Sequence, residues 1–318
     1  MSGITFSHQN PVQADNSAMH QALFYRGDRE YLDGVMRFIT PALQAGEPVM
    51  AAIPPDRGEL LRRELGGYGA EVEILDMFEL GRNPARIMPA VERMLAKHEG
   101  RTLHCVGEPI WPGRTAEEIQ EAAKHEALIN LAWPGAAIRL LCLYDTERLG
   151  PEVLADAERT HPVVIEGGTP RQTPSYSGSA VPVRSDQPLP PVPDEACELA
   201  FTIDELHDAR EVVDKEASAA GLDRARVEDL KLAVSELATN AIRHGPGRGM
   251  LHVWRRPDRL VCQVDDGGTI KDPLAGRRLP IPRAAGGLGL WAVNQLCDLV
   301  EIRSSQCGTT IRIHSLVS

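Results

Sequence analysis

The chain has 318 residues and a formal net charge of −11, with 45 acidic against 34 basic side chains. This balance argues against a nucleic-acid-binding surface, which is normally basic. The length allows two domains, each with its own core. No charged-then-apolar leader opens the chain and no apolar run reaches the ~18 residues that span a bilayer, so a cytoplasmic protein without a membrane segment is expected.

The six cysteines form no CxxC pair, and most lie in apolar runs. This pattern is typical of small buried thiols in a reducing compartment, and it favours neither disulfides nor a zinc site.

Short apolar runs alternate with helical patterns over the first half of the chain. The expected strands are 22–25, 48–53, 71–76, 102–107 and 138–144, and the expected helices lie near 29–45, 56–66, 84–98, 115–132 and 151–158. Because strands 49–53 and 140–143 are continuously apolar, they are expected to be covered on both faces. The alternation predicts an α/β domain with a mainly parallel sheet.

Several short motifs occur in residues 1–166. They are His20-Gln-Ala-Leu-Phe-Tyr25, Gly46-Glu-Pro-Val49, Gly107-Glu108-Pro-Ile-Trp111, His125-Glu126-Ala-Leu-Ile-Asn130, Cys142-Leu-Tyr-Asp145 and Thr160-His161-Pro162. With these motifs the segment resembles the MEDS sensory domain of methanogen and methylotroph regulators. The resemblance implies a sensor of an unknown small-molecule signal.

No metal is expected in this first domain. His104 and Cys105 are neighbours on a predicted strand, so their side chains point to opposite faces and cannot hold one ion together. His161 precedes Pro162 and is interpreted as a capping or packing residue.

Residues 167–193 are rich in Gly, Pro and Ser and lack apolar periodicity. Such a composition predicts an extended, semi-rigid linker between two domains.

Residues 194–318 have a different order of elements. Strands are expected at 199–203, 250–255, 259–265, 299–304 and 309–314, and helices at 205–220, 224–243 and 290–297. This order predicts an α+β two-layer sandwich, with helices on one face of a mixed sheet.

Glu236 and Asn240 are four residues apart on a predicted helix whose opposite face is apolar. A carboxylate and an amide one turn apart offer oxygen ligands of the kind Mg²⁺ takes. Two glycine-rich turns downstream, 265–268 and 286–290, present bare backbone N–H groups to which phosphate oxygens can bind. Together these features indicate a nucleotide site.

The boxes Glu236-Leu-Ala-Thr-Asn240-Ala-Ile-Arg-His244-Gly245, Val264-Asp265-Asp-Gly267 and Gly287-Leu-Gly289-Leu290, with Gly308-Thr309-Thr310 near the end, resemble those of Bergerat-fold (GHKL) ATPases. The likeness covers roughly 199–314 and is greatest to anti-sigma-factor serine kinases. One departure is that the family's second glycine, two residues after Gly267, is Thr269 here, with Gly268 before it.

The resemblance implies ATP and Mg²⁺ as cofactors and gives each box a role. Glu236 would be the catalytic base or orient the attacking hydroxyl, and Asn240 would bind Mg²⁺. Asp265, with Gly267, would accept from the adenine amine, and Thr309 and Thr310 would support the base. Gly287, Gly289 and Leu290 would bind phosphate. The segment 269–286 resembles a mobile lid, whose Arg277, Arg278 and Arg283 could meet the γ-phosphate.

The function that follows is an ATP-dependent protein serine/threonine kinase controlled by the first domain. It would phosphorylate a serine of an antagonist (anti-anti-sigma) protein and sequester a sigma factor. Kinases of this branch commonly pair through their ATPase domains, so the resemblance is compatible with a homodimer. A sensor histidine kinase is an alternative, but it requires a phosphoacceptor histidine on a helical hairpin where this chain has a Pro-rich linker. A nucleotide-gated adaptor without phosphotransfer also fits, because Glu236 is compatible with both functions.

Overall fold

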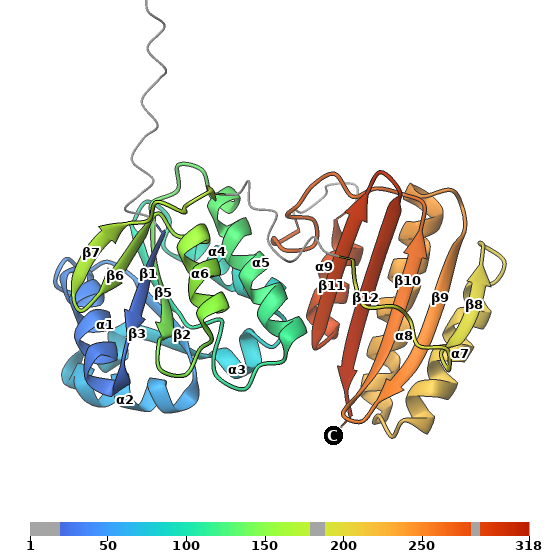
Figure 1. Cartoon of the computed structure of the whole chain (residues 1–318), viewed down its shortest axis with the longest axis horizontal. Helices are drawn as coiled ribbons and strands as arrows, with labels where there is room; N and C mark the ends of the chain where they lie inside the picture. The colour runs from blue at the N-terminus through green and yellow to red at the C-terminus, as the bar shows by residue number, and fades with distance from the viewer. Residues whose placement is uncertain (1–19, 179–187, 281–286, 318) are drawn as a thin grey trace, which may run out of the picture.

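The computed structural model describes residues 20–178, 188–280 and 287–317, which form two domains side by side (Figure 1). No helix in these ranges combines the length and the apolar character needed to cross a membrane.

The first domain is built on a seven-stranded sheet with the order β3-β2-β4-β5-β1-β6-β7. All its pairings are parallel except that of β6 with β7, so the predicted mainly parallel sheet is confirmed. The strands are β1 (His20–Tyr25), β2 (Val49–Ile53), β3 (Val72–Asp76), β4 (Leu103–Gly107), β5 (Ile138–Asp145), β6 (Val163–Glu166) and β7 (Thr169–Gln172).

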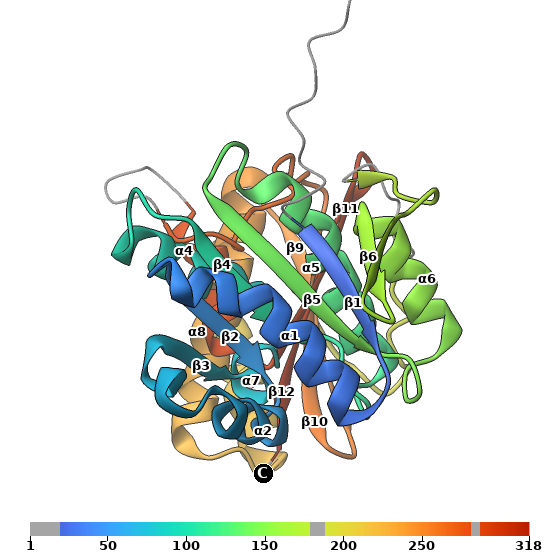
Figure 2. The same cartoon turned by 90° about the vertical axis from the view of Figure 1, so that its left-hand side faces the viewer.

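Helices cover both faces of this sheet (Figure 2). Helices α1 and α2 pack on the face that carries Leu141, while α4, α5 and α6 pack on the face that carries Leu140. Burial on both faces explains why β2 and β5 are apolar throughout. The helices are α1 (Gly27–Gln44), α2 (Pro55–Leu65), α3 (Met77–Leu80), α4 (Ile87–Lys97), α5 (Ala116–Ala132) and α6 (Pro151–Thr160), with 3-10 turns η2 (Gly66–Glu71) and η3 (Pro84–Arg86).

The second domain is a two-layer sandwich, as predicted. Its sheet has the order β11-β12-β10-β9-β8, and the helices lie behind it in Figure 1. The expectation of a mixed sheet is wrong, because every pairing within the described residues is antiparallel. The elements are β8 (Cys197–Phe201), α7 (Leu206–Ala219), α8 (Arg224–His244), β9 (Gly249–Arg256), β10 (Arg259–Asp266), α9 (Leu288–Leu296), β11 (Leu299–Ser305) and β12 (Gly308–Leu316).

The segment predicted as a linker begins with structure. Its residues 169–172 form β7, which pairs antiparallel with β6 through the turn at Gly167 and Gly168. The described end of the segment runs over the helix-free face of the second sheet (Figure 1), where Arg312 donates to the Pro190 carbonyl at 2.7 Å. The connection is therefore attached to both sheets.

Helix α5 joins the two domains. It begins with a capping box between Thr115 and Glu118, which satisfies free N–H groups of its first turn. Further along, Lys124 Nζ donates to the Ile302 carbonyl of β11 at 2.8 Å. Since β11 is at the end of the sheet order, α5 covers an edge strand that would otherwise be open.

A crevice of about 380 Å³ lies at the carboxyl ends of the parallel strands β1, β4 and β5. Tyr25, Arg57, Glu108, Trp111 and Asp145 are among its lining residues. Glu108 is 2% exposed. Its Oε1 accepts from Tyr25 Oη at 2.8 Å, while its Oε2 has no hydrogen-bond partner. Burial raises the pKa of Glu108 to about 7, despite the opposing effects of Tyr25 and Arg57.

The raised pKa of Glu108 makes stability depend on pH. Between the unfolded pKa of about 4.3 and the folded value of about 7, only the folded state holds the proton, so this group's contribution falls as pH rises through that window. Glu108→Gln removes the dependence, so the variant should gain stability relative to wild type as pH rises. Urea unfolding midpoints of both proteins, measured at several pH values between about 4.3 and 7, give this difference in stability. Glu71→Gln, at an exposed position, is the control, and parallel curves for wild type and Glu108→Gln would contradict the expectation.

Candidate functional site

A cavity of about 840 Å³ lies between α8, α9 and the ends of β10 and β12. Its walls combine apolar side chains with polar groups at the helix and strand ends. The first domain also contributes, through Glu92 and Leu95 from α4 and Trp133 after α5.

Helix α8 brings Asn240 to this cavity, and Glu236, one turn earlier on the helix, lies beside Gly289 of α9. The helix starts at the N-cap Asp223, whose side chain accepts from Arg226 N, and its apolar face is buried in the core of the domain. Asn240 lines the cavity. A Cβ atom placed on Gly289 would lie 2.5 Å from Glu236 Oε2 and 3.5 Å from Asn240 Nδ2. The two side chains and the start of α9 therefore meet at one point.

The glycines before and within α9 also reach the cavity. Gly287, Gly289 and Leu290 line it together. Gly287 precedes the helix with φ +90°, a conformation that favours glycine. Free N–H groups at the start of a helix attract anions, so this end of the cavity suits phosphate.

The structure does not place Asp265 in the cavity. Leu260, Cys262 and Val264 of β10 face the helices, so Asp266 shares that face and Asp265 points to the opposite one. Asp266 lines the cavity, whereas Asp265 and Gly267 line a separate pocket.

Asp265 has partners on its own side of the sheet. Its carboxylate accepts from Gln263 Nε2 at 2.7 Å and Thr310 Oγ1 at 2.5 Å, and His252 Nε2 lies 3.3 Å away. The assignments of Asp265 and Gly267 are corrected by one residue, to Asp266 and Gly268. Gly268 lines the cavity, and its N–H donates to Asp266 Oδ1 at 2.5 Å. With Gly268 as the turn glycine, the family's second glycine falls on Ile270, so the departure from the family pattern moves by one residue.

The same alternation separates the two threonines of β12. Thr309 shares a face with the core residues Ile311 and Ile313 and lines the cavity. Its Oγ1 donates to the Gly268 carbonyl at 2.9 Å, which ties β12 to the turn after β10. Thr310 faces away, toward Asp265, so its assignment to the site is wrong.

The segment predicted as a lid is described for residues 269–280, and Arg283 lies outside the described residues. Its other two arginines, Arg277 and Arg278, contact the first domain. Arg278 Nε donates to Glu92 Oε1 of α4 at 2.6 Å, and the Leu279 N–H donates to Glu92 Oε2 at 2.6 Å. Arg277 Nη2 donates to Glu121 Oε2 of α5 at 2.9 Å.

Glu121 is 1% exposed and also accepts from Arg303 Nη1 of β11 at 2.7 Å. Burial raises the pKa of this carboxyl, but the cations Lys124, Arg277 and Arg303 outweigh burial, and the net pKa lies below its usual value. Glu121 is therefore an anion that holds the lid segment and the second sheet against α5.

Sequence reasoning missed Glu92, Trp133 and Glu121. Each lies in an ordinary amphipathic helix or just after one, and each reaches the cavity or lid only because the domains pack together. No local pattern marks them.

Comparison with known families agrees with this division of the chain. Residues 19–162 match the model "MEthanogen/methylotroph, DcmR Sensory domain" (MEDS), and residues 199–314 match "Histidine kinase-like ATPase domain". Among solved structures, the RsbU and RsbW domains of Rv1364c from Mycobacterium tuberculosis align at 20% identity with a TM-score of 0.29, covering 38% of this chain and 32% of that one. The Acinetobacter baumannii histidine kinase AdeS aligns at 12% identity with a TM-score of 0.25, covering 38% of this chain and 68% of that one. At TM-scores this low, neither structure adds support to the fold.

Curated relatives match the second domain. The serine-protein kinase RsbW of Listeria innocua serovar 6a is 35% identical over 103 residues, which is 27% of this chain and 64% of the relative. This chain therefore spans less than two thirds of that relative's length. The RsbW of Bacillus pumilus is 32% identical over 111 residues, which is 30% of this chain and 68% of the relative. The chain thus belongs to the family of RsbW serine-protein kinases and joins a MEDS domain to its histidine kinase-like ATPase domain.

Proposed function

We propose that the protein binds Mg-ATP in the cavity between α8 and α9 and transfers phosphate to a serine of a partner protein. The observation that carries the proposal is the meeting of Glu236, Asn240 and the start of α9 at Gly289. A carboxylate, an amide oxygen and free N–H groups then surround one point, where the terminal phosphate of ATP would lie.

The rest of the cavity fits an adenine base. Val264, Leu290 and Ile311 supply apolar surface, and Asp266 supplies one carboxylate at its edge. A flat heteroaromatic ring buries its faces against such surface, while an exocyclic amine donates to the carboxylate. Asp266 would therefore have the role that was predicted for Asp265.

The oxygen donors of Asn240 and the adjacent Glu236 suit a hard cation, so Asn240 would hold Mg²⁺, which neutralises phosphate charge when bound. Glu236 would accept a proton from the attacking serine hydroxyl and orient it. Phosphoryl transfer requires little beyond positioning and charge neutralisation, so these groups suffice.

Matched substitutions of Asp265 and Asp266 test where the adenine base binds. We expect Asp266→Asn to weaken ADP binding about tenfold or more. The amide is a weaker acceptor than the carboxylate, and the lost hydrogen bond should cost roughly 1.4 kcal/mol or more of binding free energy. Asp265→Asn, on the opposite face, should bind as wild type does. Isothermal calorimetry on the full chain measures both. A loss confined to Asp265→Asn would reverse the assignment.

Glu236 and Asn240 test the chemistry. Glu236→Gln should keep Mg-ATP binding and lose phosphate transfer, because the amide cannot accept the hydroxyl proton. Asn240→Ala should lose the Mg²⁺ dependence of ATP binding. The measurements are calorimetry with and without Mg²⁺, and transfer of labelled phosphate to candidate antagonist proteins. Binding without transfer by the wild type to any such protein would favour the adaptor alternative.

The partners proposed are an antagonist protein that carries the target serine and a sigma factor, and a homodimer is compatible with them. The support is that the relatives are named serine-protein kinases. The histidine kinase alternative needs a phosphoacceptor hairpin before the ATPase domain, and the described residues between β7 and β8 contain no α-helix. Acid-stable phosphate on the substrate would identify a serine or threonine, and acid-labile phosphate would revive the alternative.

We further propose that the first domain controls the ATP site through the lid segment. In the structure, Glu92 and Glu121 hold the arginines Arg278 and Arg277, which are then not available to phosphate. A signal bound in the crevice beside Glu108 would shift the first domain and release or tighten these contacts. The crevice offers Arg57 and Asp145 beside aromatic rings, so it suits a small polar molecule.

Glu121 tests this control without touching the cavity, which it does not line. If its ion pair restrains the lid by about 1.4 kcal/mol, Glu121→Gln should bind ATP about tenfold more tightly. Glu117→Gln is the matched control, because Glu117 lies on the same helix and pairs with Arg256 at 2.9 Å, away from the lid. Equal ATP affinities for wild type and both variants would contradict the proposed control.

A further inference from the structure

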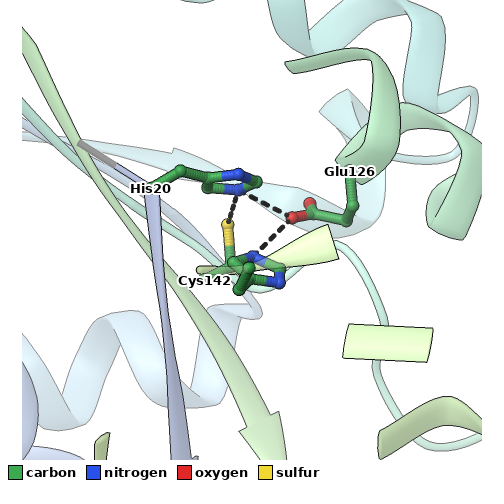
Figure 3. Close-up of side chains that lie close together, drawn as sticks. His20, Glu126 and Cys142 are labelled. Carbon is green, nitrogen blue, oxygen red and sulfur yellow. Dashed lines mark hydrogen bonds and ion pairs between the residues drawn. The ribbon is translucent and has the colours of Figure 1, made fainter. Parts of the chain in front are cut away.

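Four buried side chains from separate parts of the first domain meet beside α5. Three of them are His20 of β1, Glu126 of α5 and Cys142 of β5 (Figure 3), and the fourth is His161, which follows α6. Each is at most 5% exposed. None is part of the nucleotide cavity or of the crevice at Glu108.

The ligand-bearing atoms of these residues all lie within 4.8 Å of one another. His20 Nε2 is 3.2 Å from Glu126 Oε2 and 3.4 Å from Cys142 Sγ, and His161 Nε2 is 3.1 Å from Glu126 Oε2. A tetrahedral zinc site with bonds of about 2.0–2.3 Å places neighbouring ligand atoms about 3.3–3.6 Å apart. The cluster therefore has nearly the size of such a site.

The remaining nitrogens of both histidines are held by oxygen atoms. His161 Nδ1 lies 2.8 Å from the Ala157 carbonyl, which can only accept, so Nδ1 carries the hydrogen. His20 Nδ1 lies 3.1 Å from Asn130 Oδ1, and Asn130 Nδ2 donates to the Thr160 carbonyl at 2.9 Å, which fixes the orientation of the amide. Both neutral rings thus direct the Nε2 lone pair into the cluster, as metal-binding histidines do.

A hydrogen-bond network alone does not satisfy this arrangement. When both rings are neutral, the two Nε2 lone pairs and the Glu126 carboxylate are all acceptors, and the Cys142 thiol offers them a single hydrogen. His161 Nε2 is close enough to Glu126 for an ion pair but has no hydrogen bond of acceptable geometry, and it is fully buried. A cation at the centre would turn these contacts into attractive ones.

We propose that His20, Glu126, Cys142 and His161 bind a Zn²⁺ ion. Two imidazole nitrogens, one sulfur and one carboxylate oxygen form a donor set typical of zinc, and the thiolate and carboxylate balance its charge. Four protein ligands leave no open position, so the ion is structural and fixes α5 to β1 and β5. The expectation of no metal in this domain, and of a purely capping role for His161, is revised accordingly.

The wild-type protein gives the first test. Full-length chain is stripped with a chelator and titrated with Co²⁺ under nitrogen. We expect saturation at a single equivalent, with a thiolate-to-cobalt charge-transfer band, strong tetrahedral d–d bands, and displacement of both by Zn²⁺. Weak, octahedral-type spectra without the thiolate band would overturn the proposal.

Three variants locate the site. Cys142→Ser should lose the charge-transfer band, while Cys262→Ser, which alters a buried cysteine of the other domain, should keep it. Asn130→Leu removes the hydrogen-bond partner of the ligand His20. It should weaken the affinity for zinc about 10–100-fold, while the charge-transfer band remains. If Cys142→Ser does not fold, the titrations of wild type and Asn130→Leu still decide. A thiolate band that persists in folded Cys142→Ser, or unchanged affinity in Asn130→Leu, would refute the assignment.

Discussion

The alternation of side chains along the paired strands β10 and β12 decides what the second domain can bind. In this antiparallel pair, Asp266 lies opposite Thr309 and Asp265 lies opposite Thr310. The first pair faces the helices and the cavity, and the second pair faces away. The core residues Val264 and Ile311 fix this register, because a shift by one residue would expose them. The site therefore depends on burial of the apolar face as much as on its own polar groups.

Much of this organisation could be predicted from the sequence. Most strands and helices were expected within a few residues, since both sheets and α8 have clear apolar periodicity. The sites at Glu236, Asn240, Gly287 and Gly289 were predicted from local spacing on one helix and one turn, and local spacing survives folding. The strands β6 and β7 were not expected, and the pairing directions in the second sheet, which depend on how distant strands meet, were partly wrong.

The errors at single residues have a common cause. Asp265-Asp266, Gly267-Gly268 and Thr309-Thr310 are doublets, so a motif can be placed on either member of each. The apolar pattern of Leu260, Cys262 and Val264 contains the missing information, because it assigns Asp266 to the helix-facing side. Contacts between domains, such as Glu121 with Arg277, have no such pattern. They depend on how two independently folded surfaces pack, which no local spacing encodes.

Helix α5 is the element on which both halves of the protein depend. On one side of this helix, Glu121 contacts Arg277 of the lid segment and Arg303 of β11. On its other side, little more than one turn later, Glu126 belongs to the buried cluster. A helix transmits a shift along its axis as a rigid rod, because its backbone hydrogen bonds resist local stretching. Any change that moves Glu126 relative to β1 and β5 must therefore also move Glu121 relative to the lid. One helix therefore contacts both the lid arginine Arg277 and the buried cluster of the first domain, although no residue of that cluster lines the cavity between α8 and α9.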